Sequence, residues 1–556
     1  MEETGLTEAA RISRFTGVLL SALACLMVPL QAISQADLQD RLRVRIEAAF
    51  LAGSMEVMDE RVQARNTLQR VYTARGFAPM WVSAEGLTER GQHLADWLET
   101  EPQKHGLRPA DYHLRSVSRL EDEDRAGALV DLELALSDAF AMLASHFLAG
   151  RLNPESLDPE WFASRRHRDL LPVIEKAATM RAPGDALAEL LPNGEGYARL
   201  VQKLASLRDI LARGGWPSVD PGPTLRQGDA GPRVLQVAER LRRSGYYEGA
   251  GAEAFGTDLA AAVKRFQAVH GLAADGVIGQ ATLRALNVSP QTRVEQVIVN
   301  LERWRWLPED LGERYIIVNI AGFDLDVIEH GENRMSMRVV VGQPYRRTPV
   351  FSGTMTYLVL NPWWEVPRSI AVKDKLPLIK SDPAYLERQG YSLLTGWGAD
   401  EQALDAAAID WSGVTAASFR FRLRQKPGPQ NALGRVKFMF PNPHSVYLHD
   451  TPSRELFAKD MRSFSSGCIR LEHPLELAEL LLSSTEAWRR PDIDRALASG
   501  RETIVKLPRP IPVHLLYWTA WADEDTVHFR DDIYGRDERV LRELRKAPPG
   551  PDNGPA

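Results

Sequence analysis

Hydrophobic positions in the first part of the chain recur with the spacing of one helix face. The clearest series has apolar residues at i, i+4, i+7, i+8 and i+11, and consists of Leu132, Leu136, Ala139, Phe140 and Leu143. Such a series places its side chains on one side of a helix. Long β-branched runs, which favour strands, do not occur before residue 215. We therefore predict a helical domain over residues 37–220. We expect it to be a scaffold, because it contains no catalytic residue pattern.

A second, shorter helical module follows a linker. Three prolines and a glycine fall between Pro217 and Pro223, and such a stretch is typical of a connection between domains. Two apolar series at i, i+3, i+4 and i+7 come next, namely Val234, Val237, Ala238 and Leu241, then Leu259, Ala262, Val263 and Phe266. A turn at Asp275-Gly276 precedes a third short helix. We predict a three-helix module over residues 224–288.

The period of the pattern changes near residue 315, where β-branched runs begin. They cover residues 315–320, 337–342, 355–360 and 435–440, and turn residues separate them. This pattern predicts a β-rich domain over residues 295–540, with a β-sandwich as the expected form. Residues 368–430 are charged and rich in turn residues, so we expect an insertion that folds over the domain as a cap. The fold class is multidomain α+β, with a tail at residues 541–556.

The N-terminus has the pattern of an export signal. Arg11 and Arg14 precede an apolar run from Val18 to Val28, and small residues at 32, 34 and 36 offer cleavage points. The run is short for a membrane span, which favours cleavage over a retained anchor. We therefore expect residues 1–36 to be a signal peptide or anchor. The expected location is the periplasm or cell envelope, and any membrane attachment is through an uncleaved signal.

Composition narrows the function classes. The formal net charge of −6 gives no basic surface for nucleic acid, and 44% hydrophobic and 26% charged residues are typical of globular domains. The chain has two cysteines, Cys25 and Cys468, so cleavage of the signal leaves one unpaired thiol. An unpaired thiol in an oxidising compartment suggests a use, although a buried inert cysteine is the alternative. No zinc-binding motif occurs, and we expect neither a metal nor a cofactor.

A histidine and this cysteine are the candidate catalytic pair. His449 ends a predicted strand over residues 446–450, and Cys468 follows 19 residues later. This separation suits a loop between them that brings the two residues together. Imidazole can take the thiol proton, and the thiolate is the nucleophile. Gly467 lets substrate backbone approach, and the Cys468 amide can stabilise an oxyanion. Alternation along a strand places Arg470 beside the cysteine.

Further residues are candidates for the substrate cleft. Trp364, in an aromatic pair with Trp363, is either a core residue or a cleft wall. Tyr447 shares a strand face with His449. Arg420 and Arg422 alternate with phenylalanines, which predicts a cap strand whose basic face meets substrate carboxylates or only solvent. The sequence assigns no group to orient His449, and a backbone carbonyl is one possibility.

Two groups of motifs resemble known families. Residues 228–231, 266–272 and 275–279 resemble the three-helix peptidoglycan-binding domain. His449 together with Ser466-Gly467-Cys468-Ile469-Arg470 resembles the active-site signature of L,D-transpeptidases with a YkuD-type domain. Many members have a second histidine where Ser466 stands. Serine there matches the branch of large enzymes with a helical scaffold, a peptidoglycan-binding domain and a cap. The sequence segments at residues 517–521 and 531–535 also resemble the C-terminal end of that branch.

The resemblance implies a reaction on peptidoglycan. Cys468 is the implied nucleophile and His449 the implied base. In the implied reaction Cys468 attacks the amide carbonyl of the third residue of a tetrapeptide stem, and terminal D-Ala leaves. The acyl group then passes to the side-chain amine of the third residue of another stem. The implied partners are peptidoglycan stem peptides and glycan, with carbapenem-type β-lactams as covalent inhibitors. Water as acceptor would give an L,D-carboxypeptidase, and a protein acceptor an attachment enzyme. A catalytically inactive peptidoglycan-binding scaffold is the alternative from another class.

Overall fold

The computed structural model describes residues 33–113, 125–163, 165–249, 251, 253–523 and 526–548. Almost all of the predicted signal and the last eight residues of the predicted tail lie outside these ranges. The predicted tail starts too early, because helix α19 (Arg536–Leu544) continues past residue 541 and buries Val540 and Leu544 in the core of the β-rich domain. None of the helices within the described ranges combines the length and apolar character needed to cross a membrane.

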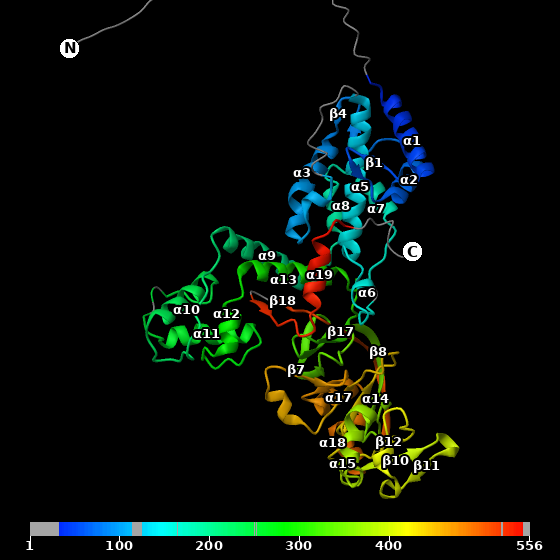
Figure 1. The fold of residues 1–556 in the computed structure, drawn as a ribbon. Helices are drawn as coiled ribbons and strands as arrows, with labels where there is room; N and C mark the ends of the chain where they lie inside the picture. Colours follow the sequence, from blue (N-terminus) through cyan, green and yellow to red (C-terminus); the bar gives the residue numbers. More distant parts are fainter. Residues whose placement is uncertain are drawn as a thin grey trace, which may run out of the picture.

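The N-terminal region is a helical domain around one central helix (Figure 1). That helix, α5 (Arg125–Ala149), is buried on nearly all sides. The surrounding helices are α1 (Gln35–Ala52), α2 (Arg65–Ala74), α3 (Glu89–Lys104), α7 (Leu171–Ala177) and α8 (Gly184–Ala188). The short helix α6 (Pro154–Leu157) follows α5, and its Leu157 packs on the core of the β-rich domain. Two short hairpins, β1–β2 (Glu56–Val57, Glu60–Arg61) and β3–β4 (Val82–Ser83, Gly86–Leu87), complete it. The predicted helical class is confirmed for this region.

Two buried carboxylates on α5 hold these hairpins in place. Glu133 accepts hydrogen bonds from the Tyr72 hydroxyl and from the backbone amides of residues 80, 81 and 82. Asp138 accepts from the amides of residues 63 and 64. Since a buried carboxylate must be fully hydrogen-bonded to be tolerated, these polar positions inside an apolar helix fix where the hairpins dock.

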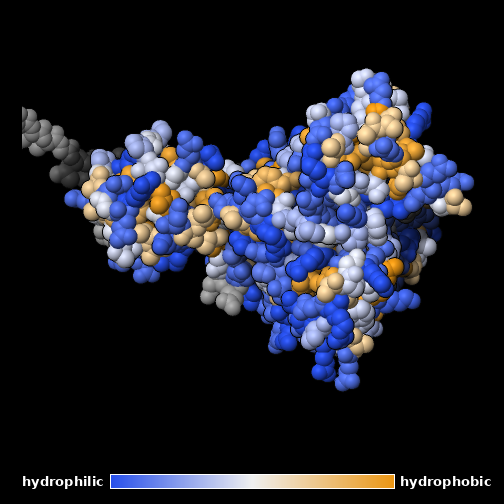
Figure 2. Space-filling model, turned by 90° about the horizontal axis from the view of Figure 1, so that it is seen from below, coloured by the Kyte–Doolittle hydropathy of each residue, from blue (hydrophilic) through white to orange (hydrophobic). Residues whose placement is uncertain are grey.

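The second module contains the three predicted helices. They are α10 (Pro232–Arg243), α11 (Thr257–Val269) and α12 (Gln280–Leu286), and they enclose their own hydrophobic core. Gln267 on α11 fastens the turn before α12, because its amide nitrogen donates to Asp275 and to the Val277 carbonyl while its oxygen accepts from the Gly276 amide. Figure 2 shows this module, on the left, as a lobe separate from the larger body of the molecule.

Helices α9 (Glu195–Ala212) and α13 (Pro290–Arg305) join the parts. They pack on each other and on the C-terminal hairpin β18–β19 (Ala520–Asp523, Thr526–Phe529) through a shared apolar cluster. Helix α13 starts before the predicted boundary at residue 295. Its buried Glu302 pairs with Arg305 and accepts from the Leu152 amide, which connects it to the scaffold. Figure 1 shows this junction between the scaffold, the three-helix module and the β-rich domain.

The β-rich domain is built on one sheet that closes on itself. Within the described residues the pairing order is β7-β16-β14-β13-β8-β17-β5-β6, and β6 pairs again with β7. The strands are β5 (Arg314–Asn319), β6 (Asp324–Glu329), β7 (Glu332–Gly342), β8 (Phe351–Leu360), β13 (Val436–Met439), β14 (Leu448–His449), β16 (Ile469–Leu471) and β17 (Thr503–Leu516), with β15 (Ser463–Ser465) beside the end of β7. The expected β-rich α+β class is confirmed, although the strands form a closed ring rather than two separate sheets.

Helices α17 (Pro474–Leu482) and α18 (Arg490–Ala498) pack on the ring with buried leucines and Ile493. An insertion between β8 and β13 forms a separate small sheet in the order β11-β10-β12-β9. Its strands are β9 (Trp364–Glu365), β10 (Tyr391–Thr395), β11 (Gln402–Leu404) and β12 (Arg422–Gln425), with helices α14 (Arg368–Ile370), η2 (Ala371–Lys375), α15 (Leu376–Ser381) and α16 (Tyr385–Arg388). This cap has its own core, which runs from Trp364 to Leu433 and so begins before the expected residue 368.

Candidate active site

Strand register brings the candidate residues to one face of the ring. β14 and β16 are parallel, with Leu448 opposite Ile469 and His449 opposite Arg470. Leu448 and Ile469 are buried in the core of the ring. Since successive side chains on a strand point to opposite faces, Tyr447 and His449 lie on the other face, together with Cys468 and Arg470. The Tyr447 and His449 rings are in edge contact, with centroids 5.9 Å apart.

His449 is a neutral, oriented base. Its Nδ1 lies 2.5 Å from the backbone oxygen of Asp450. Because a carbonyl only accepts, Nδ1 carries the proton and Nε2 remains the basic atom. Burial, reinforced by the positive charges of Arg470 and Lys437, lowers the pKa of His449 to about 3. The group that orients this histidine is therefore the Asp450 carbonyl. The sequence had left a backbone carbonyl as one possibility.

The Cys468 thiol is half-buried and protonated at rest. Its sulfur lies 3.8 Å from the Ser445 carbonyl oxygen. Burial raises the pKa of the thiol, while hydrogen bonds from the Tyr447 amide and hydroxyl and the charges of Lys437 and Arg470 act in the opposite direction. No hydrogen bond joins His449 to Cys468 among the described residues, so the resting pair is a thiol and a neutral imidazole. Such contacts often tighten only when substrate is bound.

The loop before the cysteine needs glycine at one position. Gly467 has a φ of +119°, a backbone conformation that residues other than glycine rarely adopt. Its amide donates to the Ser465 hydroxyl at 3.1 Å, and its carbonyl accepts from the Thr348 hydroxyl at 2.8 Å. The Gly467 amide is therefore occupied. The Cys468 amide makes no hydrogen bond within the described chain and remains the candidate oxyanion donor.

Ser466 connects this loop to the cap. Its hydroxyl accepts a hydrogen bond of 2.8 Å from Arg346, and the same guanidinium binds both carboxylate oxygens of Asp374, at 2.5 and 2.6 Å. Asp374 belongs to η2 of the cap, and Arg346 lies in the loop after β7. We call these three residues the cap latch. It links the position of the cap to the loop that carries the nucleophile.

Tyr447 stands between the cysteine and the cap, and a lysine that sequence analysis missed lies next to it. The Lys437 ammonium is 3.8 Å from the centre of the Tyr447 ring, and Lys437 pairs with His449 in the register of β13 and β14. Burial lowers the pKa of Lys437, and the nearby Cys468 partly opposes this effect. The available signal was a lysine within an apolar strand, on the face opposite to its core residues Val436 and Phe438.

Of the candidate cleft residues, Trp364 and Tyr447 lie together, whereas Arg420 and Arg422 lie elsewhere in the cap. Trp364 is buried in the cap core, against which Tyr447 packs. Arg422 is paired with Glu365 at 2.7 Å and Glu401 at 3.0 Å, and its guanidinium lies over the Trp397 ring. Its charge is already balanced, which favours a structural role inside the cap. Arg420 is exposed.

Arg470 lies on the same face with its guanidinium largely buried. Its Nε has no hydrogen-bond partner, and burial lowers its pKa. Together with Lys437 it makes the floor of the site positive. A buried, incompletely paired cation favours an anionic neighbour. Such a neighbour can be the thiolate during reaction or a carboxylate of the substrate.

Comparison with family models divides the chain as the fold does. A scaffold domain model matches residues 66–204, and a "Putative peptidoglycan binding domain" model matches residues 230–286. A model of the L,D-transpeptidase catalytic domain, named YkuD, matches residues 313–493. This last match contains His449, Cys468 and the cap.

One curated relative and several solved structures are similar. A Haemophilus influenzae protein named "Putative L,D-transpeptidase" is 34% identical over 277 residues, which span about half of each protein, 49% of this chain and 55% of the relative. The L,D-transpeptidase of Stackebrandtia nassauensis matches at 13% identity and a TM-score of 0.21, over 54% of this chain and 96% of its own. That of Xylanimonas cellulosilytica (residues 123–326) matches at 15% identity and a TM-score of 0.18, over 53% and 100%.

Proposed function

We propose that this chain is an exported enzyme that crosslinks peptidoglycan stem peptides through an acyl group on Cys468. Its residues 313–493 match the YkuD-type L,D-transpeptidase catalytic domain. The observation that carries the proposal is the shared strand face. A cysteine on a glycine turn shares this face with a neutral histidine whose Nδ1 is held by a carbonyl. The scaffold and peptidoglycan-binding matches support a wall substrate.

The first half of the reaction is acylation. The sulfur of Cys468 attacks the carbonyl carbon of the third stem residue while Nε2 of His449 takes the thiol proton. The oxyanion that forms can accept from the Cys468 amide, and one such donor is typically worth about 3 kcal/mol. When the amide bond breaks, the imidazolium returns its proton to the nitrogen of D-Ala, which leaves. A thioester on Cys468 remains.

The second half transfers the acyl group. The side-chain amine of another stem's third residue attacks the thioester carbonyl, and His449 takes a proton from that amine. A new amide forms, the carbon–sulfur bond breaks, and the proton returns to the sulfur. Lys437 and Arg470 favour the thiolate as leaving group, because positive charge stabilises it. No oxidant or other co-reactant is needed.

Muropeptide mass spectrometry tests this function. Purified chain is incubated with wall fragments rich in tetrapeptide stems, and products are compared with those of Cys468→Ala. Dimers that lack one D-Ala support transfer. Tripeptide monomers without dimers would assign an L,D-carboxypeptidase, and attachment of a protein amine would assign an anchoring enzyme.

A carbapenem provides an independent test of the nucleophile. We expect a one-to-one covalent adduct on Cys468, measured as a mass increase of the intact protein, and no adduct on Cys468→Ala. If the wild-type chain forms neither adduct nor product but still sediments with isolated wall, the catalytic domain is inactive and the chain is a binding scaffold. Cell fractionation tests the proposed export, which requires the mature protein outside the cytoplasmic membrane.

A further inference from the structure

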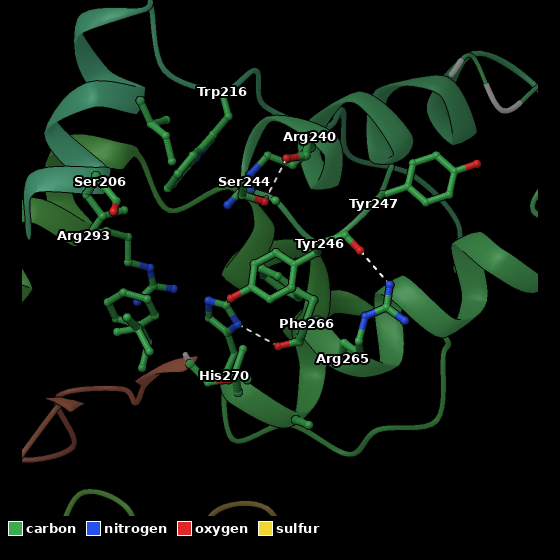
Figure 3. A pocket seen from close by; sticks show the side chains of 18 of the residues that line it. Ser206, Trp216, Arg240, Ser244, Tyr246, Tyr247, Arg265, Phe266, His270 and Arg293 are labelled. Carbon is green, nitrogen blue, oxygen red and sulfur yellow. Dashed lines mark hydrogen bonds between the residues drawn. The ribbon is translucent and has the colours of Figure 1, made fainter. Parts of the chain in front are cut away.

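A pocket lies where the three-helix module meets α9, α13 and the C-terminal hairpin (Figure 3). We call it the junction pocket. It has a volume of about 980 Å³ and lies outside the candidate active site. Its lining comes from four places in the chain, represented by Ser206 of α9, Arg240 and Tyr246 of the module, Arg293 of α13 and Phe529 of β19.

Two buried arginines line this pocket without a carboxylate partner. Arg240 is 1% exposed, its Nε donates to the Leu286 carbonyl at 2.6 Å, and its Nη1 has no hydrogen-bond partner. Arg293 is 7% exposed and donates from Nη1 to the side chain of Gln296 at 2.7 Å. Among the described residues neither guanidinium has a carboxylate oxygen within 4.0 Å. In Figure 3 Arg293 points from α13 towards Tyr246 and His270.

Burying a cation without an anion is unfavourable, and the titration of both groups reflects this. Burial, followed by the charge of Arg293, lowers the pKa of Arg240 to about 9. Burial also lowers the pKa of Arg293 to about 10. A bound anion would relieve this cost, and the planar guanidinium fork fits a carboxylate with two parallel hydrogen bonds.

Aromatic rings surround the two guanidinium groups. Arg240 lies 4.0 Å from the centre of the Trp216 ring, and Arg293 lies 4.5 Å from that of Phe529. Tyr246 and a neutral His270, whose pKa burial keeps well below its usual value, complete the wall. A ligand for this pocket therefore has a carboxylate and, next to it, apolar atoms that can pack on rings.

We propose that the junction pocket is a second peptidoglycan-binding site, in which Arg240 and Arg293 hold a free carboxylate of a stem peptide. This inference rests on the proposed function, since stem peptides carry free carboxylates next to small apolar side chains. The site is composite. Arg240 comes from the three-helix module, whereas Arg293 and Phe529 come from outside it. Binding therefore fastens that module to α13 and needs the whole chain.

Hydrogen–deuterium exchange of the full chain carrying Cys468→Ala tests the site, because it reports each region separately. The probe is a soluble tetrapeptide stem with free carboxylates. We expect saturable protection in segments 240–248 and 526–530. The same peptide with its carboxylates amidated is the second probe, and we expect it to leave these segments unprotected. This comparison needs no change in the pocket, so it holds even where a pocket variant fails to fold.

Variants then assign the arginines. Adding Arg293→Gln to Cys468→Ala is expected to raise the half-saturation concentration for junction protection about tenfold or more, the effect of losing one charge-assisted hydrogen-bond pair. Arg242→Gln is the matched control. It removes the same charge from the same module, but Arg242 is exposed on α10, pairs with Glu239 and lies outside the pocket. Ser206→Trp, which fills the pocket from α9, is expected to abolish junction protection without removing a buried charge.

The outcomes separate this proposal from the proposed function. Protection of the loop at residues 445–468 without protection at the junction would overturn the second site and leave the enzyme function standing. Junction protection that survives amidation of the probe would overturn carboxylate recognition. If inorganic phosphate alone protects the junction as strongly as the peptide, the pocket is a general anion site and the stem-peptide proposal fails.

Discussion

The reactivity of Cys468 depends on a few charges within one strand face. Burial favours the protonated thiol, whereas Lys437 and Arg470 favour the thiolate. His449 can only help as a neutral base, which its lowered pKa ensures.

Replacing Lys437 with methionine should raise the pKa of the Cys468 thiol. The substitution keeps the length of the side chain and removes the positive charge that favours the thiolate. The measurement is the pH dependence of iodoacetamide alkylation at Cys468, whose midpoint should move upward. Lys506→Met, at an exposed position on β17, is the control and should leave the midpoint unchanged. An unmoved midpoint in the Lys437 variant would exclude this role.

The rate of carbapenem acylation should show no inflection near pH 6.5 from His449. The folded pKa of about 3 lies below the ordinary value of 6.5, so the imidazole is already neutral between those values.

In the unfolded chain the His449 imidazole binds a proton below pH 6.5. Its contribution to stability is therefore present above pH 6.5 and declines as the pH falls towards 3. An inflection near 6.5 that disappears in His449→Gln would contradict the buried, neutral state.

At the scale of elements, the cap is held to the catalytic ring by few polar contacts. Its core is separate from that of the ring, and the two meet at Tyr447, Trp364 and the cap latch. The latch involves the residue next to Gly467. Small movements of the cap can therefore displace the loop that carries the nucleophile.

Asp374→Asn should slow acylation more than it lowers stability. The latch is partly exposed, and ion pairs of that kind contribute about 0–1 kcal/mol to folding. Without it, Arg346 loses its anchor and Ser466 a defined partner. The check is the rate of carbapenem adduct formation beside the thermal midpoint. Asp382→Asn, which breaks another exposed ion pair of the cap with Arg388, is the control and should change neither measurement appreciably.

At the scale of the whole molecule, helix α19 returns to join the scaffold to the catalytic domain (Figure 1). Arg536 at its start is 2% exposed. It pairs with Asp158 at 2.6 Å and Glu160 at 3.0 Å, both from the segment that leaves the scaffold. The adjacent Trp161 forms a bridge with Val350 of the catalytic domain. These contacts make the two domains one unit.

Arg536→Met should uncouple the two domains. Removing one partner of a buried ion pair typically costs about 3–5 kcal/mol, because here the Asp158 carboxylate stays buried without compensation. We expect calorimetry to show two unfolding transitions in place of one. Arg542→Met, on the exposed side of the same helix, should unfold as the wild type does. A single unshifted transition in the Arg536 variant would show that α19 is dispensable for coupling.

Local patterns in the sequence were enough for the elements and for the reactive residues. Apolar spacing predicted a helical scaffold with α5 in it and the helices of the three-helix module, and β-branched runs predicted β5, β7, β8 and β13. These patterns are short-ranged, because each depends on how neighbouring residues share one face. The candidate pair of His449 and Cys468 came from the same local information. The sequence also singled out Gly467, but as room for substrate backbone, and the positive φ that requires glycine there is a finding of the structure.

Only the tertiary structure decided what depends on residues far apart in the chain. The closure of the ring, the register that places Lys437 beside Tyr447 and the start of the cap at Trp364 all result from strand pairing. Arg422 was a candidate to meet substrate carboxylates or only solvent, but its distant partners Glu365 and Glu401 hold it in the cap. The junction pocket needs four separate segments. Pairing across such separations is selected by packing and charge in three dimensions, which no local period encodes.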